Sequence, residues 1–126
     1  MTKDRIKEFR EDRERLNKLV MKYAGINTKR FHNIDRQVYN DGALKSKTKE
    51  LMGLVSSLVL RCDDCIMYHL IRCREEGVSD KELEETLAIG LIVGGSITIP
   101  HIRRVWDAWD NMKQNYNFPK GKNKYG

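Results

Sequence analysis

The chain has 126 residues, of which 40% are apolar and 33% are charged, which suits one domain with a moderate core. This composition excludes an intrinsically disordered chain, and the small number of breakers (2 prolines and 9 glycines) favours long helices over a β fold with many turns. The net charge of +6 is compatible with binding to nucleic acid or to an acidic membrane surface. However, charges of both signs alternate along the N-terminal segment, as is typical of a solvated helix face. Because zinc-finger spacing and aromatic–basic RNA motifs are also absent, we expect no nucleic-acid partner.

The sequence has no apolar stretch long enough to span a bilayer and no apolar N-terminal segment typical of a secretory signal. We therefore expect a cytoplasmic protein with no membrane partner. The count of 3 cysteines is odd, which argues against a framework of structural disulfides. A close cysteine pair in a reducing compartment indicates metal binding, redox chemistry or coincidence.

Two helices are predicted before residue 41. Apolar residues recur at helical spacing over residues 3–24, and Gly25 then gives a stop signal. Residues 28–39 show the same periodicity and end before the turn sequence "NDG". We interpret residues 1–41 as an N-terminal helical extension.

Four more helices are predicted after this extension. Residues 46–60 are too apolar for a surface helix, and residues 62–76 follow them and stop at Gly77. Ser79 and Glu82 fit a capping box that opens a fifth helix, and a sixth helix begins near Pro100. The prediction is a compact all-α bundle of five or six helices in one domain, residues 1–126. Residues 42–110 form its core and residues 115–126 form a basic tail.

The segment "LRCDDCIMYH" places three reactive side chains on one side of a predicted helix. Cys62 and Cys65 are one turn apart, and His69 is one turn beyond Cys65. Thiols at a helix N-terminus meet unpaired N–H groups and the positive end of the dipole, which favour the thiolate. His69 could serve as a general base or, as imidazolium, stabilise a thiolate.

Three carboxylate side chains could affect the thiols or the imidazole of this site. Asp63 and Asp64 could cap the new helix, but their charges disfavour a nearby thiolate. Along one continuous helix Glu50 would lie about 18 Å from Cys62. A break near Arg61 would fold the two helices together and could bring Glu50 to the imidazole, which it would then orient.

The full spacing is Glu50, eleven residues, Cys62, two residues, Cys65, three residues, His69. This arrangement, in its helical surroundings, resembles the carboxymuconolactone decarboxylase-like superfamily in its alkylhydroperoxidase D-like branch. The resemblance covers about residues 42–110. It implies an all-helical fold that assembles as an obligate homo-oligomer, a trimer or a hexamer.

The resemblance also implies a thiol-dependent oxidoreductase, either a peroxidase or a disulfide reductase. Cys65 would attack the peroxide and Cys62 would resolve the sulfenic acid to a disulfide, while His69 and Glu50 would form a proton relay. The implied partners are a small-molecule hydroperoxide or disulfide and a protein thiol reductant. We expect no metal and no other cofactor, since the sequence has no nucleotide loop and no haem attachment signature.

The sequence departs from this branch at one position, and the departure keeps alternatives open. The best-known peroxidase members have a histidine directly before the second cysteine, where this chain has Asp64. A carboxylate cannot replace an imidazole as a base near neutral pH without a large upward pKa shift. The alternatives are a carboxymuconolactone decarboxylase-type enzyme, a non-catalytic oligomeric scaffold, and a zinc site of both cysteines and His69 completed by His101 or by a neighbouring subunit. The resemblance favours the thiol chemistry over decarboxylation, because the decarboxylase branch of the superfamily does not rely on a cysteine pair. We interpret Cys73 as a core thiol and assign no function to His101 or His32.

Overall fold

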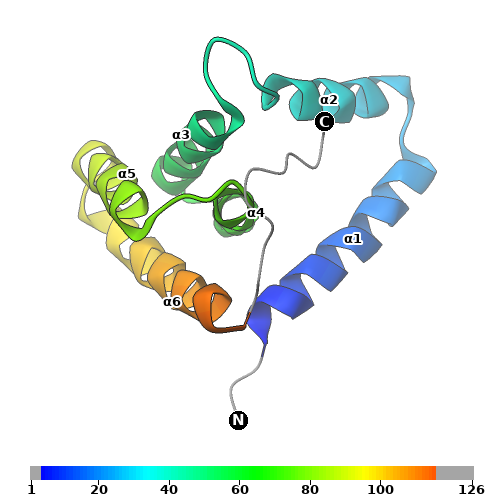
Figure 1. The fold of residues 1–126 in the computed structure, drawn as a ribbon. Coiled ribbons are helices and arrows are strands. Elements are labelled where there is room, and N and C mark those ends of the chain that lie inside the picture. Colours follow the sequence, from blue (N-terminus) through cyan, green and yellow to red (C-terminus); the bar gives the residue numbers. More distant parts are fainter. Residues whose placement is uncertain (1–3, 116–126) are drawn as a thin grey trace. The chain divides into compact units, whose positions relative to one another are not determined.

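The computed structural model describes residues 4–115, and all of their regular structure is helical (Figure 1). The elements are α1 (Arg5–Tyr23), α2 (Ile26–Val38), α3 (Ser46–Leu60), α4 (Asp63–Glu75), α5 (Asp80–Gly94), the 3-10 helix η1 (Ser96–Thr98) and α6 (Ile99–Asn115). This confirms the predicted all-α class with six α-helices. The predicted basic tail lies outside the described residues except for its first position. No described helix combines the length and the apolar character needed to cross a membrane.

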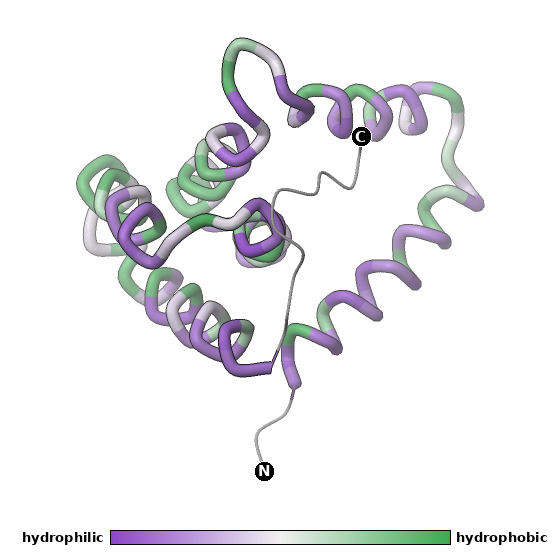
Figure 2. Tube along the Cα trace, viewed as in Figure 1, coloured by the Kyte–Doolittle hydropathy of each residue, from purple (hydrophilic) through white to green (hydrophobic). Residues whose placement is uncertain are grey.

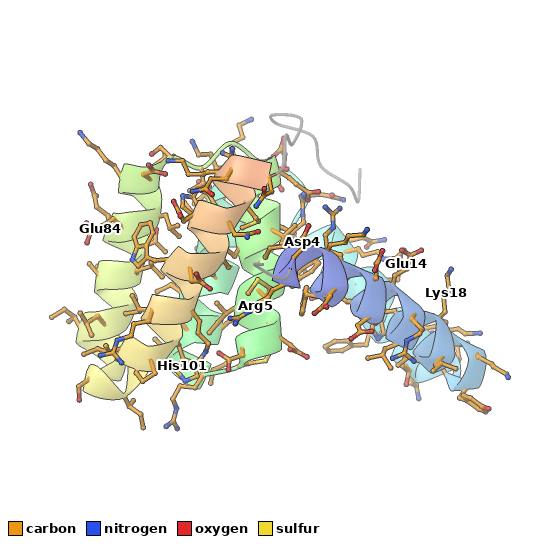
Figure 3. The ribbon with its side chains drawn as sticks, turned by 90° about the horizontal axis from the view of Figure 1, so that it is seen from below. Asp4, Arg5, Glu14, Lys18, Glu84 and His101 are labelled. Carbon is orange, nitrogen blue, oxygen red and sulfur yellow. A yellow bond between two sulfur atoms is a disulfide. The ribbon has the colours of Figure 1, made fainter. Side chains whose placement is uncertain are left out.

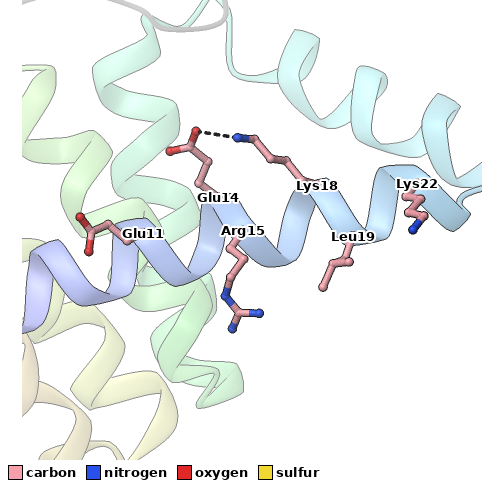
Figure 4. Close-up of a pocket in the computed structure, with 6 residues that line it drawn as sticks. All are labelled: Glu11, Glu14, Arg15, Lys18, Leu19 and Lys22. Atoms are coloured by element: carbon pink, nitrogen blue, oxygen red, sulfur yellow. Dashed lines mark ion pairs between the residues drawn. The ribbon is translucent and has the colours of Figure 1, made fainter.

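The chain divides into two compact units, and the first contains α1 and α2. The Asp4 carboxylate caps α1, accepting a hydrogen bond from the Lys7 backbone N–H at 3.0 Å. Both helices keep large apolar side chains exposed, for example Tyr23 and Phe31. A shallow hollow on this unit is lined by six residues of α1 alone, and Glu14 and Lys18 pair across it at 3.6 Å (Figure 4).

The second unit begins at Asn40 and contains the remaining helices. Helix α3 packs against α4 and α5, α4 also packs against α6, and η1 joins α5 to α6. Figure 2 shows apolar residues along α3 and α5. The side chains at the centre of this unit are almost fully buried: Leu54, Leu58, Leu70, Leu83, Val105 and Met112. Their burial is the main driving force that holds this unit together.

A tight turn at Arg61 reverses the chain between α3 and α4. Arg61 has a φ of 59°, a left-handed conformation uncommon for a residue with a side chain. Its backbone N–H donates to the Leu58 carbonyl at 3.0 Å, and the Cys62 N–H donates to the Ser57 carbonyl at 3.1 Å. The turn therefore ends α3 with its carbonyls satisfied and starts α4 along the side of α3.

Local side-chain chemistry fixes the N-terminal end of α5. The predicted capping box is confirmed, since the Ser79 hydroxyl accepts from the Glu82 N–H while the Glu82 carboxylate accepts from the Ser79 N–H. Asp80 accepts hydrogen bonds from the Trp109 indole at 2.8 Å and from the Lys113 ammonium at 2.7 Å. These bonds tie the start of α5 to the end of α6 and lower the pKa of Asp80 below its ordinary value.

Candidate thiol site

The two cysteines of the predicted pair lie at the N-terminal end of α4 and form a disulfide, with their Cα atoms 5.3 Å apart. Cys62 is the N-cap residue, and its Sγ accepts a hydrogen bond from the Cys65 backbone N–H at 3.3 Å. The prediction that Asp63 or Asp64 caps this helix is therefore wrong. Both carboxylates lie in the first turn of α4, one and two positions past the cap. Cys65 is exposed and Cys62 is half-buried, so Cys65 is the more accessible residue of the pair.

The turn at Arg61 brings Glu50 of α3 to His69 of α4, as predicted from a break between the two helices. The His69 Nδ1 and the Glu50 Oε1 are 2.8 Å apart, and the Glu50 side chain is fully buried. Because a carboxylate only accepts, the imidazole donates through Nδ1 in this contact. Gly53, one turn beyond Glu50, makes room for the ring, since a Cβ there would lie 2.7 Å from the His69 Cε1. Glu50 and Gly53 of α3 together position the His69 imidazole of α4.

Arg72 completes what we call the buried cluster, which consists of Glu50, His69, Arg72, Glu75 and Glu76. The Arg72 Nε lies 3.3 Å from the second Glu50 oxygen, and the guanidinium donates to Glu75 at 2.8 Å and to Glu76 at 3.1 Å. Burial alone would lower the pKa of Arg72, but the hydrogen bond to Glu75 and the three carboxylate charges raise it above its ordinary value.

Arg72 was not among the residues predicted from the sequence. A signal was present, because Arg72 follows His69 by three positions and so lies one turn further along the same side of α4. A cationic side chain on the core-facing side of a helix is removed from water. It therefore needs a buried carboxylate as its partner.

A second set of charged side chains, the surface cluster, joins α4 to α6 and consists of Asp63, His101 and Arg104. The His101 Nδ1 lies 2.7 Å from the Asp63 Oδ1, and Arg104 lies 3.3 Å from Oδ2. Figure 3 shows His101 near the N-terminal end of α6. The Arg104 guanidinium also approaches the His101 Nδ1 at 3.1 Å, but that nitrogen cannot accept from Arg104 while it donates to the carboxylate.

The surface cluster favours the charged form of Asp63. Partial burial raises the pKa of this carboxyl, but the hydrogen bond from His101 and the charge of Arg104 outweigh that effect, and the pKa lies below its ordinary value. The sequence assigned no function to His101, because the contact joins residues 38 positions apart. The signal that could have found the cluster is the placement of His101 and Arg104 one turn apart at the start of a helix.

The third cysteine is separate from this pair. Cys73 is fully buried and free, which confirms its interpretation as a core thiol. Burial, followed by the nearby Glu50 charge, raises the pKa of its thiol well above the ordinary value. Within residues 4–115, no three His, Cys, Asp or Glu side chains gather closely enough to hold a metal ion.

Comparison with solved structures identifies relatives of the whole described fold. Two crystal structures of a protein from Thermotoga maritima have 56% and 55% sequence identity to this chain, with TM-scores of 0.84 and 0.82. They cover 86% and 85% of this chain and 95% and 91% of the other. One of them is described as a carboxymuconolactone decarboxylase family protein for which a role in the antioxidative response has been suggested. A family member from Legionella pneumophila has the same fold, with a TM-score of 0.78 and 23% identity over 86% of this chain and 96% of that one.

Two sequence relatives are uncharacterized, and a family match gives the assignment. An uncharacterized Cupriavidus necator protein is 29% identical over 65 residues, which is 52% of this chain and only 58% of that protein. Protein 4 of the cox locus of Paracoccus denitrificans is 24% identical over 82 residues, 65% of this chain and 74% of that protein. Residues 27–108, more than half of the chain, match the carboxymuconolactone decarboxylase family. The chain therefore belongs to the carboxymuconolactone decarboxylase family.

Proposed function

We propose that this protein is a thiol-dependent peroxidase of the alkylhydroperoxidase D-like branch and that Cys62 and Cys65 are its redox couple. The observation that carries the proposal is the disulfide at the N-terminus of α4, one turn before a His69 imidazole that is held by the buried Glu50. The antioxidative role suggested for the Thermotoga maritima relative supports this proposed function.

In the first step the Cys65 thiolate attacks the terminal oxygen of a hydroperoxide, ROOH. The sulfur–oxygen bond forms as the oxygen–oxygen bond breaks, and Cys65 becomes a sulfenic acid while the substrate leaves as the alcohol ROH. Cys65 is the attacking residue in this scheme because it is the more exposed of the two cysteines. Its place in the first turn of α4 adds the field of the helix N-terminus, which favours the thiolate.

In the second step the Cys62 thiolate attacks the sulfur of the Cys65 sulfenic acid, and water leaves as the disulfide forms. Cys62 is suited to this because its Sγ already accepts the Cys65 backbone N–H, an interaction that stabilises a thiolate at the cap position. Two electrons and two protons from a dithiol reductant then restore both thiols. The sum is ROOH plus the reduced reductant giving ROH, water and the oxidised reductant.

The buried cluster supplies the proton transfers in this scheme. The Nδ1 of His69 donates to Glu50, which leaves Nε2 as the nitrogen that exchanges protons with the thiols and the leaving alkoxide. Arg72 holds the second Glu50 oxygen and so keeps the carboxylate oriented toward the ring. Gly53 keeps the space that the ring occupies.

A peroxide turnover assay coupled to a dithiol reductant tests the proposal. We expect turnover by the wild type, none by Cys65→Ser, and one stoichiometric oxidation without turnover by Cys62→Ser. Cys73→Ser is the matched control, because the buried thiol takes no part, and its turnover should equal that of the wild type.

Mass spectrometry of reduced protein exposed to mild peroxide gives a direct test of the chemistry. The peptide that contains both cysteines of the pair should lose two hydrogens as Cys62 and Cys65 join. The proposal is wrong if both thiols stay free and unmodified. Turnover of a small disulfide in place of a peroxide would identify a disulfide reductase instead.

We also propose that the protein works as a homo-oligomer, a trimer or a hexamer. Large apolar side chains are exposed at the C-terminal end of α3, in the second half of α5 and in η1. These residues and their exposed fractions are Leu60 (78%), Ile89 (61%), Ile92 (84%), Val93 (68%) and Ile97 (54%). Such a group of side chains is typical of a surface that a partner covers. Sedimentation should give a trimer or hexamer, and Ile92→Lys should shift it toward the monomer; a monomeric wild type would overturn this proposal.

A further inference from the structure

The Cys62 end of the disulfide carries its own pair of a carboxylate and an imidazole. Asp63 follows Cys62 directly in the chain, and His101 and Arg104 reach it from α6. The same arrangement occurs in the buried cluster, where an imidazole Nδ1 contacts one oxygen of Glu50 and a guanidinium lies at the other oxygen.

We propose that His101 and Arg104 are positioning residues that neutralise the Asp63 carboxylate and thereby favour the thiolate of Cys62. The proposal rests on the function proposed above only in treating Cys62 and Cys65 as the working redox couple. A carboxylate beside a thiol opposes ionisation of the thiol through repulsion between like charges. Two cationic or proton-donating partners on that carboxylate reduce this repulsion without removing the carboxylate from the first turn of α4, where the helix dipole favours it.

The charge of Cys62 matters at the step that closes the catalytic cycle. A reductant thiolate attacks the more exposed Cys65 sulfur, a mixed disulfide forms, and Cys62 leaves as a thiolate. A second reductant thiolate then displaces Cys65 and completes the two-electron reduction. Because the leaving thiol departs faster when its pKa is lower, neutralising Asp63 speeds the first of these exchanges.

Several charged groups surround this end of α4. They are Arg61 and Asp63 beside Cys62 in the chain, Asp64 one position further, His101 and Arg104 from α6, and, one turn past Cys65, His69 with its partner Glu50. Of these, His101 is the most enclosed in the surface cluster, with a side chain 15% exposed against 58% for Asp63. The imidazole is therefore held against the carboxylate by the packing of α6, whereas the carboxylate itself is open to solvent and salt.

A double-mutant cycle in the Cys65→Ser background separates this effect from simple tethering of α6. The four proteins carry His101→Gln, Asp63→Asn, both changes or neither, and Cys62 is the one accessible thiol of the cysteine pair left in each. The measurement is the rate of alkylation of Cys62 as a function of pH, followed by peptide mass spectrometry. Cys73 serves as an internal standard, because its buried thiol should stay unmodified in the folded protein.

We expect His101→Gln to slow alkylation of Cys62 at neutral pH by about 3-fold, a shift of roughly half a pH unit in its profile, because the exposed charge is partly screened. In the Asp63→Asn background the same change should have no effect within about 1.3-fold, since there is no charge left to neutralise. Arg104→Gln should behave in the same way, and it provides a second cycle if the first variant does not fold. His32→Gln, a histidine on α2, is the matched control and should leave the profile unchanged.

Equal slowing by His101→Gln in both backgrounds would show that the residue only holds α6 in place, and it would overturn the proposal. No slowing in either background would overturn it as well. The cycle needs no peroxide, so its result is independent of the turnover assay. If the wild type reduces no peroxide but the cycle shows the expected coupling, the proposed function fails while this inference stands.

Discussion

The buried cluster and the surface cluster are built from the same chemical groups but lie in different surroundings. In each, an imidazole Nδ1 contacts a carboxylate oxygen, at 2.8 Å in the buried cluster and 2.7 Å in the surface cluster. In each, a guanidinium lies 3.3 Å from the other oxygen. The carboxylate is fully buried in the first case and 58% exposed in the second. Solvent access to the carboxylate is therefore the clearest difference between them.

This difference determines what each cluster can contribute. Charges that are removed from water must be matched by partners, so the loss of one member leaves the others unpaired in the interior. Exposed charges are screened by solvent and salt, so a surface partner adds little to stability. The buried cluster is suited to holding an imidazole rigidly, whereas the surface cluster is suited to adjusting the charge beside a thiol.

The largest expected effect is on stability when the buried guanidinium is removed. Arg72→Met should lower the free energy of unfolding by about 3–5 kcal/mol, because it leaves the Glu50 carboxylate buried without its cationic partner. The matched surface change, Arg104→Met, should cost less than about 1 kcal/mol. Urea denaturation followed by circular dichroism measures both values. Similar losses in the two variants would show that burial is not the property that distinguishes the clusters.

The next effect is on turnover when each carboxylate loses its charge at nearly constant shape. Glu50→Gln should slow peroxide reduction on the order of 100-fold, since the imidazole loses the carboxylate that fixes its tautomer and its orientation. Asp63→Asn should change turnover by less than about 3-fold, because it removes a screened charge that opposes the Cys62 thiolate.

The coupled peroxide assay with both variants at the same reductant concentration checks this contrast. A urea midpoint measured for each variant shows that the compared proteins are folded. A Glu50→Gln enzyme that keeps nearly full activity would remove the buried cluster from the mechanism and leave it with a structural role alone.

Local sequence chemistry accounts for much of the fold and for part of the site. The capping box at Ser79, the helix over residues 46–60 and the single helical side shared by the thiol pair and His69 all follow from neighbours within a few positions. The approach of Glu50 to His69 could be inferred as well, because it requires only a break between two adjacent helices.

Long-range packing accounts for what the sequence did not reveal. Asp63 was considered as a cap, but Cys62 takes that position and the carboxylate turns to His101, 38 residues further along the chain. Arg72 meets Glu50 only after α3 and α4 have packed together. The one-turn spacing of Arg72 from His69 and of Arg104 from His101 marks these residues in the sequence, but their partners depend on which helices become neighbours.

A smaller effect tests how tightly α3 holds the buried imidazole. Gly53→Ala should cost about 1–3 kcal/mol of stability, because its Cβ would lie 2.7 Å from the His69 Cε1 and the ring must move. The displaced ring should also lose its contact with Glu50, so turnover should fall together with stability. Gly42→Ala is the matched control, since its Cβ would meet only the flexible end of Lys49 at 3.5 Å.

The smallest expected effect is on the free energy of unfolding at acidic pH, to which the surface cluster should contribute. The pKa of Asp63 is lowered in the folded protein, so its contribution to stability is present above its ordinary value of 3.8 and is lost as the pH falls through the lower, folded value. Asp80 follows the same rule, with its pKa lowered by its bonds to Lys113 and Trp109. The free energy of unfolding should therefore be nearly constant from neutral pH to about pH 5 and should fall below about pH 4.

Urea denaturation of the wild type and of Asp63→Asn across this pH range measures the contribution of the surface cluster. The two curves should converge as the pH falls below 3.8, and they should differ by less than about 1 kcal/mol at neutral pH because the carboxylate is exposed and its ion pairs are screened. A gap of several kcal/mol at neutral pH would mean that Asp63 is as tightly coupled to the fold as Glu50 is. The surface cluster would then be a second structural core, and its role in adjusting the charge beside Cys62 would lose its physical basis.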